Sequence, residues 1–172
     1  MEHNDFEAVR TLFSQPARIV VTAHANPDGD AIGASLALAF YLRKKGHEVE
    51  VLVPDPFPGF LSWMPGSDEI LIHSVEEERC LQLVAGAGVI ISADYNQLDR
   101  LNGLSKAVIG SDAIRVLIDH HLNPSDEFDY MISETRISST SELVYQFMEA
   151  SGDIHLLDKQ MAECLYAGII TD

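Results

Sequence analysis

The chain has 172 residues, of which 11 are Lys or Arg and 27 are Asp or Glu, so its formal charge at pH 7 is −16. This charge argues against a broad electrostatic hold on duplex DNA, which needs clustered cations. A short nucleotide held through metal ions stays compatible with it. Hydrophobic residues make up 47% of the chain, which excludes disorder and allows a substantial core.

Helix and strand patterns alternate along most of the chain. Amphipathic or apolar spacing predicts helices over residues 5–14, 31–45, 75–85, 142–150 and 156–170. Short apolar or alternating runs predict strands over residues 18–23, 47–53, 69–73, 88–93, 115–118 and 128–132. The proline-rich stretch 54–66 is expected to be a long connection, and an acidic, polar loop is expected from residue 94 onward. The alternation predicts an α/β fold with a mostly parallel sheet flanked by helices on both faces.

Membrane and disulfide signals are weak. The longest apolar stretch, residues 31–42, is well short of the roughly 20 residues that a membrane span needs. The first residues carry acid where a signal peptide carries base. Two cysteines, Cys80 and Cys164, make no disulfide framework. We therefore expect a cytoplasmic protein that binds neither membranes nor duplex DNA.

Polar side chains follow three of the predicted strands. The segment 24–30 comes after the first strand, Asp94 after another, and residues 119–121 after a third. Ligands of open α/β sheets bind at the carboxyl ends of the strands. The order of elements therefore predicts one site assembled from several strand ends.

The segment 24–30 contains three ligand-type side chains, His24, Asp28 and Asp30. Its Asn-Pro-Asp-Gly sequence is also an ordinary turn, and Asp30 could simply be the N-cap of the next helix. Two carboxylates held this close repel each other unless a cation lies between them. Both interpretations stay open for this segment taken alone.

The other candidate residues gain weight from their number. Asp94 alone is consistent with a residue that starts a loop, and Asp172 alone carries no signal. A single buried histidine is more often structural than a ligand, but Asp119, His120 and His121 are three consecutive ligand-type residues. A set of His and Asp without Cys suits Mn²⁺ or Mg²⁺, and less strictly Zn²⁺ or Co²⁺. Four liganding Asp residues are too many for one ion and would neutralise two divalent ions roughly 3.5–4 Å apart.

These motifs together resemble the DHH phosphoesterase family, named for the triplet that stands here as Asp119-His120-His121. All four N-terminal motifs of that family are present in the family's order. They are His24-x-Asn-Pro-Asp28-Gly-Asp30, Asp94, the triplet, and Gly168-Ile-x-Thr-Asp172. Residues 138–142 are also similar to a segment of the bacterial nanoRNase branch, which acts as oligoribonuclease and phosphoadenosine-phosphate phosphatase. The resemblance implies a Rossmann-like DHH domain.

The family resemblance also implies residue roles. One ion would be held by His24, Asp28 and Asp94, and the second by Asp30, Asp94, His120 and Asp172. Mn²⁺ is the expected cation, with Mg²⁺ and Co²⁺ as alternatives. His121 would contact the scissile phosphate and Asp119 would orient the histidines, so that Asp119, His120 and His121 form the catalytic triplet. Asn96 and Arg100 are candidate substrate contacts, although both are equally consistent with solvated loop residues.

Family members usually continue into a smaller C-terminal domain of the DHHA1 type, which binds the substrate. The chain 1–172 is expected to be the catalytic DHH domain alone, because no Gly-Gly-Gly-His sequence occurs in it. We expect weak or absent turnover for this chain by itself. Its oligomeric state stays open, with a dimer among the alternatives.

The expected function is metal-dependent hydrolysis of short 5′-phosphorylated oligonucleotides or nucleoside 3′,5′-bisphosphate by a hydroxide that two metal ions activate. Linear dinucleotides are a further candidate substrate. A manganese-dependent pyrophosphatase or exopolyphosphatase is the alternative within the same class. A non-catalytic metal- or nucleotide-binding module is the alternative of another class. A plain dinucleotide-binding domain is disfavoured, because neither a G-x-G-x-x-G nor a Walker A sequence is present.

Overall fold

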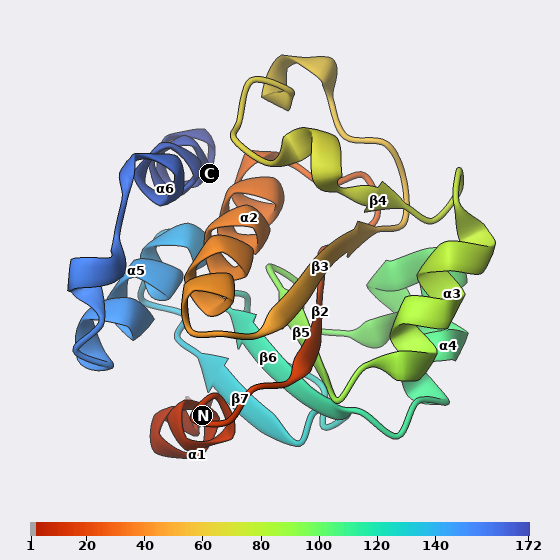
Figure 1. Cartoon of the computed structure of the whole chain (residues 1–172), viewed down its shortest axis with the longest axis horizontal. Helices are drawn as coiled ribbons and strands as arrows, with labels where there is room; N and C mark the ends of the chain where they lie inside the picture. The colour runs from red at the N-terminus through yellow and green to blue at the C-terminus, as the bar shows by residue number, and fades with distance from the viewer. Residues whose placement is uncertain (1–2) are drawn as a thin grey trace.

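Short apolar and β-branched runs form a seven-stranded sheet in the computed structural model, which describes residues 3–172 (Figure 1). The strands lie side by side in the order β1-β7-β6-β5-β2-β3-β4, and β2 to β7 are all parallel. Only β1 among them is antiparallel, at the edge beside β7. The strand bounds are β1 (His3–Asn4), β2 (Arg18–Thr22), β3 (Glu48–Val53), β4 (Leu71–Ile72), β5 (Val89–Ala93), β6 (Ile114–Asp119) and β7 (Tyr130–Ser133). The predicted mostly parallel sheet is confirmed.

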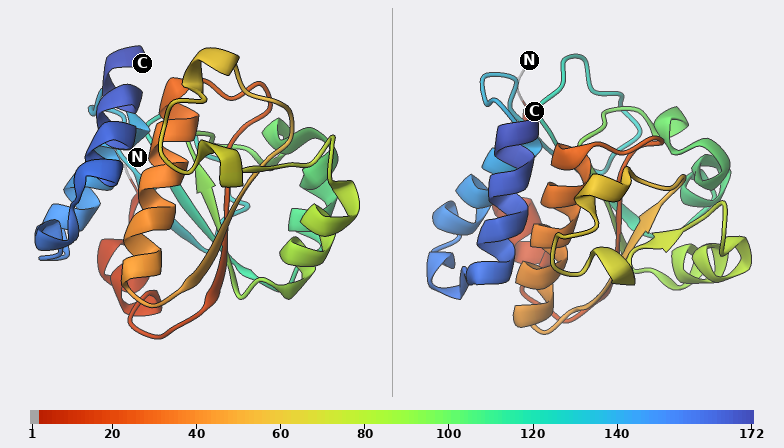
Figure 2. Two further views of the ribbon diagram at one scale, coloured as in Figure 1. Left: turned by 45° about the horizontal axis from the view of Figure 1, so that its top comes forward. Right: turned by 90° about the horizontal axis from the view of Figure 1, so that it is seen from above.

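The helices form two layers, one on each face of the sheet (Figures 1 and 2). The first layer contains α1 (Phe6–Leu12), α2 (Gly29–Lys44), α5 (Thr140–Ala150) and α6 (Lys159–Thr171). The second layer contains α3 (Glu77–Gly86), η3 (Leu98–Leu104) and α4 (Ser105–Ile109). Three further 3₁₀ turns complete the chain: η1 (Gly59–Leu61), η2 (Ser67–Glu69) and η4 (Ile154–Leu156). Helices on both faces confirm the predicted α/β class.

The central strands are apolar on both sides because both of their faces are covered. In β2, Ile19 and Val21 pack into the core under α2, whereas Val20 packs into the core under α3. All three side chains are almost fully buried. Within residues 3–172, no helix combines the length and the apolar character that crossing a bilayer would require.

Two parts of the fold differ from the sequence prediction. Residues 98–109 were expected to be part of an acidic loop and instead form η3 and α4, with Leu98, Leu101 and Leu104 buried at intervals of three residues. Asn102 has a φ of +48° and a ψ of −121°, so η3 consists of two short turns on either side of a kink, and no continuous helical period marks this segment in the sequence. The strand β1 was also missed, because a two-residue strand is defined only by its distant partner β7.

The order of the strands places a crevice between β2 and β5. From β2 the chain continues through α2 to β3 on one side, whereas β5 is followed by β6 on the other side. In parallel sheets the loops diverge at this switch in strand order and leave room for a ligand at the carboxyl ends. The loops that follow β2 and β5 carry His24 and Asp94, so the topology alone brings two predicted ligands together.

Candidate metal centre

The loop after β2 contributes His24 and Asp28. His24 is 7% exposed, and its Nδ1 lies 2.8 Å from the Ala25 carbonyl oxygen, which turns Nε2 toward the acids. This Nε2 lies 3.8 Å from Asp28 Oδ2 and 3.6 Å from Asp94 Oδ2. Burial works to lower the pKa of His24, but the Asp94 carboxylate and the other nearby acceptors outweigh it and raise that pKa.

Asp28, and not Asp30, is the N-cap of α2. Its Oδ1 accepts a hydrogen bond of 3.0 Å from the Ala31 backbone N–H, which leaves Oδ2 facing His24. The helix therefore begins two residues earlier than expected, and the alternative of Asp30 as a cap is wrong. Asp30 lies in the first turn and is 1% exposed, so its carboxylate points into the protein.

Asp94 follows β5 directly and lies at the centre of the site. It is 2% exposed, and its backbone has a φ of +66°, in the left-handed region. Its Oδ2 faces His24 Nε2, and its Oδ1 lies 3.6 Å from His120 Nε2. Burial raises the pKa of Asp94 to about 6; the His24 contact opposes this rise and the Asp30 charge adds to it.

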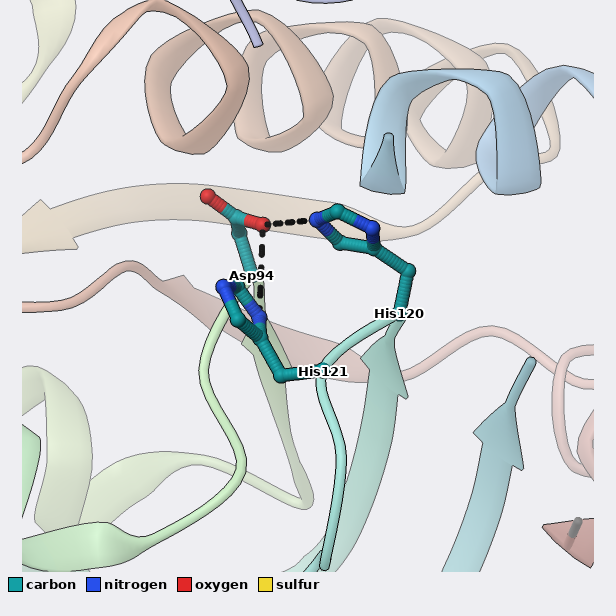
Figure 3. Close-up of side chains that lie close together, drawn as sticks. All are labelled: Asp94, His120 and His121. Atoms are coloured by element: carbon teal, nitrogen blue, oxygen red, sulfur yellow. Dashed lines mark ion pairs between the residues drawn. The ribbon is translucent and has the colours of Figure 1, made fainter. Parts of the chain in front are cut away.

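The triplet at the end of β6 divides into a buried acid, Asp119, and two histidines. The two imidazole rings are neighbours, and both present a nitrogen to Asp94 Oδ1 (Figure 3). Asp119 is fully buried and accepts a hydrogen bond of 3.0 Å from the His121 backbone N–H. The same carboxylate lies 2.6 Å from His121 Nδ1. This hydrogen bond raises the pKa of His121 to about 9, in spite of partial burial.

His120 offers a free nitrogen to the acids. Its Nδ1 lies 3.3 Å from the Ile137 carbonyl oxygen, and its Nε2 is buried without a hydrogen-bond partner. That Nε2 lies 3.5 Å from Asp172 Oδ2, 3.6 Å from Asp94 Oδ1 and 3.9 Å from Asp30 Oδ2. These separations are too long for hydrogen bonds and suit donor atoms that share an ion. A buried acceptor nitrogen aimed at three carboxylates is the arrangement that a cation would complete.

Asp172 reaches the site through close packing of α6 against α2. The two helices run antiparallel, because Gly29 lies against Thr171 and Gly33 against Cys164 and Gly168. A Cβ at Gly33 would lie 2.5 Å from the Cys164 carbonyl oxygen, so only glycine permits this approach. The last turn of α6 therefore lies beside the first turn of α2, where Asp28 and Asp30 are.

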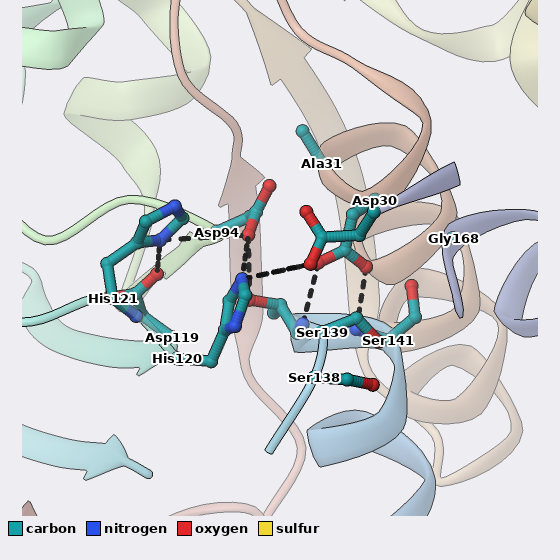
Figure 4. Close-up of polar contacts among 12 residues, drawn as sticks. Asp30, Ala31, Asp94, Asp119, His120, His121, Ser138, Ser139, Ser141 and Gly168 are labelled. Carbon is teal, nitrogen blue, oxygen red and sulfur yellow. Dashed lines mark hydrogen bonds and ion pairs between the residues drawn. The ribbon is translucent and has the colours of Figure 1, made fainter. Parts of the chain in front are cut away.

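The first turn of α5 binds the site from a third direction (Figure 4). The backbone N–H groups of Thr140 and Ser141 donate to the two oxygens of Asp30, at 2.6 and 2.8 Å. The Thr140 hydroxyl donates to Asp94 Oδ1 at 2.8 Å. The sequence indicated a family resemblance for residues 138–142 but none of these contacts. Ser139 caps α5, through its hydroxyl and the Glu142 N–H.

Within the described residues, ligand atoms meet in three groups, each spanning less than 4.8 Å. One contains His24, Asp28 and Asp94, and another contains Asp30, His120 and Asp172. In the third, His121 joins Asp94 and His120 through Nδ1, but that nitrogen is already bonded to Asp119. The first two groups are therefore the candidate cation sites, and Asp94 faces both. Oxygen and imidazole donors without sulfur fit Mn²⁺ and Mg²⁺.

The predicted substrate contacts lie near the site but are engaged in different ways. The Asn96 amide donates to the Leu122 carbonyl oxygen at 2.6 Å and ties the loop after β5 to the loop after the triplet. The Arg100 carbonyl oxygen accepts a hydrogen bond of 2.8 Å from the Ala25 N–H, and the Arg100 side chain is exposed. Roles for both side chains in substrate binding stay predictions.

Comparison with known proteins identifies the family to which the chain belongs. Residues 18–169 match the model of the DHH family, N-terminal domain. The chain is 32% identical over 168 residues to the bifunctional oligoribonuclease and PAP phosphatase NrnA of Bacillus subtilis (96% of this chain, 49% of that protein). It is 28% identical over 163 residues to a probable manganese-dependent inorganic pyrophosphatase of Streptococcus mutans (91% of this chain, 48% of that protein). The chain thus spans about half the length of these curated relatives.

A solved structure has the same fold. The crystal structure of an exopolyphosphatase-related protein from Bacteroides fragilis superposes with a TM-score of 0.93 at 40% sequence identity. The match covers 96% of this chain and 48% of that one. The chain therefore has the fold of the matched half of that protein.

Proposed function

The chain belongs to the DHH family, and on that premise we propose that it supplies the catalytic domain of a metal-dependent hydrolase of small phosphate esters. The enzyme class follows from the family. The number of ions, the residue roles and the substrate are the proposal.

The position of Asp94 carries this proposal. Its buried carboxylate presents Oδ2 to the group of His24 and Asp28, and Oδ1 to the group that contains His120. One carboxylate between two sets of donors is the arrangement of a bridging ligand. Two divalent cations held in this way lower the pKa of a shared water and offset charge on the phosphoryl oxygens.

The ligand set balances the charge of such a pair. His24, Asp28 and Asp94 would hold one ion, and Asp30, Asp94, His120 and Asp172 the other. The four carboxylates carry −4, and two divalent cations carry +4. Burial and the charge of Asp30 raise the pKa of Asp172, and Asp94 behaves similarly, so the carboxylates are crowded without a counter-charge.

His121 is suited to the phosphate and not to the metal. Its Nδ1 is bonded to Asp119, and its side chain is 47% exposed, so Nε2 is available to a ligand. The Asp119 hydrogen bond raises the pKa of His121, which favours the protonated imidazole, and with Nδ1 bonded to Asp119 the ring would donate from Nε2 to a phosphoryl oxygen. Asp119 holds the ring in this orientation. His121 thus binds and neutralises the phosphate while His120 binds metal.

Short nucleotides are the proposed substrates. The support is the similarity to a relative named as oligoribonuclease and PAP phosphatase, together with a chain charge of −16. A long polyanion needs a basic channel, whereas a dinucleotide or a nucleoside 3′,5′-bisphosphate needs only the metal pair and a few donors. Arg100 and Asn96 are the proposed further donors from the loop after β5.

A second candidate is the hydrolysis of pyrophosphate or polyphosphate. It is favoured by the similarity to a probable manganese-dependent pyrophosphatase, and by the 40% identity to an exopolyphosphatase-related protein. Both candidate reactions attack phosphorus with the same ligand set. They differ in the group attached to the phosphate that is attacked, which is a nucleoside in the first candidate and a further phosphate in the second.

A calorimetric titration of this chain with Mn²⁺ tests the metal centre. Because weak or absent turnover is expected of this chain by itself, hydrolysis assays on a protein that joins it to a substrate-binding domain then test the substrate. We expect two Mn²⁺ per chain and release of mononucleotide from a 5′-phosphorylated dinucleotide, or of phosphate from adenosine 3′,5′-bisphosphate. Release of phosphate from pyrophosphate with an intact dinucleotide would establish the second candidate. Two bound ions without turnover of any of these would indicate a binding module. Absence of Mn²⁺ binding would contradict the metal centre itself.

A further inference from the structure

The first residue of α5 contacts ligands from both proposed cation sites. Its backbone N–H donates to Asp30 Oδ2 at 2.6 Å, and its hydroxyl donates to Asp94 Oδ1 at 2.8 Å. We propose that Thr140 is a positioning residue that holds the Asp94 carboxylate in the orientation needed to bridge two cations. This inference rests on the two-metal site proposed above.

The orientation of Asp94 is not determined by its backbone. The terminal torsion of an aspartate is broad, so its carboxylate rotates readily about the Cβ–Cγ bond. A quarter turn would move Oδ1 away from His120 and Oδ2 away from His24, each now 3.6 Å distant. The hydrogen bond from Thr140 is shorter than either of these contacts and fixes Oδ1 on the side of His120.

The position of Thr140 at the start of the helix makes this contact available. Within a helix, a threonine hydroxyl often bonds to the carbonyl oxygen four residues earlier. At the first position of α5 there is no preceding helical turn, so the hydroxyl can bond outside the helix. Thr140 is fully buried, which excludes water as a competing partner for the hydroxyl.

Asp30 and Asp94 are both bonded to the first turn of α5, but only the hydrogen bond to Asp94 can be removed by a side-chain substitution. Asp30 accepts its hydrogen bonds from the backbone N–H groups of Thr140 and Ser141, which no substitution by an ordinary residue removes. Asp94 accepts from a side chain. Thr140→Val therefore removes the hydroxyl alone and preserves the shape and the backbone contacts, whereas Thr140→Ser retains the hydroxyl.

The test compares Mn²⁺ binding by the full chain and its variants, by calorimetry and by electron paramagnetic resonance of the loaded site. We expect Thr140→Val to weaken binding of at least one ion by roughly 10- to 100-fold, the range for residues that orient metal ligands. The magnetic coupling of a bridged Mn²⁺ pair should diminish with it. Thr140→Ser should retain both properties. The matched control, Ser138→Ala, removes a hydroxyl that bonds to Glu142 and not to a ligand, and should bind like wild type.

The outcomes separate the inference from the proposed function. Two ions bound by Thr140→Val with wild-type constants and wild-type coupling would overturn the role of Thr140 and leave the metal pair standing. A wild-type chain that binds fewer than two ions would contradict the proposed function, and this inference with it. Circular dichroism of the metal-free proteins is measured first. If Thr140→Val is unfolded, Thr140→Ala takes its place and the same two outcomes decide.

Discussion

The two helical layers bury the sheet in different ways. In the first layer, α2 and α6 touch through glycines, and α5 donates backbone N–H groups to a buried carboxylate. In the second layer, leucines of η3 and apolar residues of α3 and α4 fill the core, and Gly86 at the end of α3 has no atom near its missing side chain. Approach of backbone to backbone at Gly33 thus brings the last turn of α6 beside the first turn of α2, where two of the acids lie. In the second layer, the close contact at Gly103 is with the His73 side chain.

Asp30→Ala should have the largest effect of any change in the first layer. It removes a carboxylate from the group with His120 and Asp172, so one ion is lost together with several kcal/mol of charge stabilisation. We expect turnover of the active protein to fall by at least on the order of 10³-fold, with the fold intact by circular dichroism. Asp112→Ala is the control, an exposed acid shortly before β6. Unchanged turnover in Asp30→Ala would contradict the two-metal assignment.

Leu104→Ala tests the second layer. This side chain is fully buried at the end of η3, and its truncation should lower the free energy of unfolding by about 2–5 kcal/mol. Because none of the proposed ligands lies on η3, the Mn²⁺ affinity of the folded variant should equal that of wild type. Denaturant unfolding and calorimetry below the transition measure the two quantities. A parallel loss of affinity and stability would show that the layers are not independent.

The substitution of a glycine by alanine can be compared between the two layers, with Gly168→Ala in the first layer and Gly86→Ala in the second. A Cβ added at Gly168 would collide with Ser141 Oγ and lie 2.9 Å from Asp30 Oδ1. We expect a loss of about 1–3 kcal/mol of stability from overpacking, together with weaker binding of the ion near Asp172. Gly86→Ala is the matched control in the second layer and should be neutral or slightly stabilising. Equal effects of the two variants in thermal melts would remove the distinction between the layers.

Asp153→Asn should change the free energy of unfolding least of these variants. Asp153 packs against the C-terminal end of α2, whereas the proposed ligands lie at its N-terminal end. Asp153 accepts hydrogen bonds from Tyr41 on α2 at 2.5 Å and from Lys45, the C-cap of α2, at 2.7 Å. Burial works to raise its pKa, but these hydrogen bonds and the Lys45 charge outweigh burial and lower it.

A lowered pKa sets the pH range of this contribution. The ionised Asp153 stabilises the fold above the ordinary pKa of about 4, and this stabilisation is lost as the pH falls through the lower folded-state pKa. We expect Asp153→Asn to cost about 1 kcal/mol at pH 7 and less as the pH falls below 4. Unfolding measured across pH 2–7 checks this. A constant difference between variant and wild type would exclude a role for the carboxylate charge.

The parallel sheet could be predicted from the sequence. Strands β2 and β5 are covered by helices on both faces, so they consist of continuous apolar runs that are easy to recognise. The sequence also predicted that the polar residues after these strands would meet, since parallel strands end at one edge. The contacts of Thr140 could not be predicted. Its partners are 46 and 110 residues away, and the local pattern there is satisfied by a helix cap. The kink at Asn102 likewise leaves no continuous helical period by which η3 could be recognised.

The left-handed backbone of Asp94 limits how this position can change. Glycine would relieve about 1–2 kcal/mol of steric cost at φ +66°, but it would bring no carboxylate. Glutamate would keep the charge but is poorly accommodated in that conformation and reaches too far. Asparagine fits the backbone and the hydrogen bond from Thr140, yet it carries no negative charge. A homologous protein with asparagine at position 94 would thus keep the fold and the rest of the site, but it would lack the negative charge proposed to bridge the two cations.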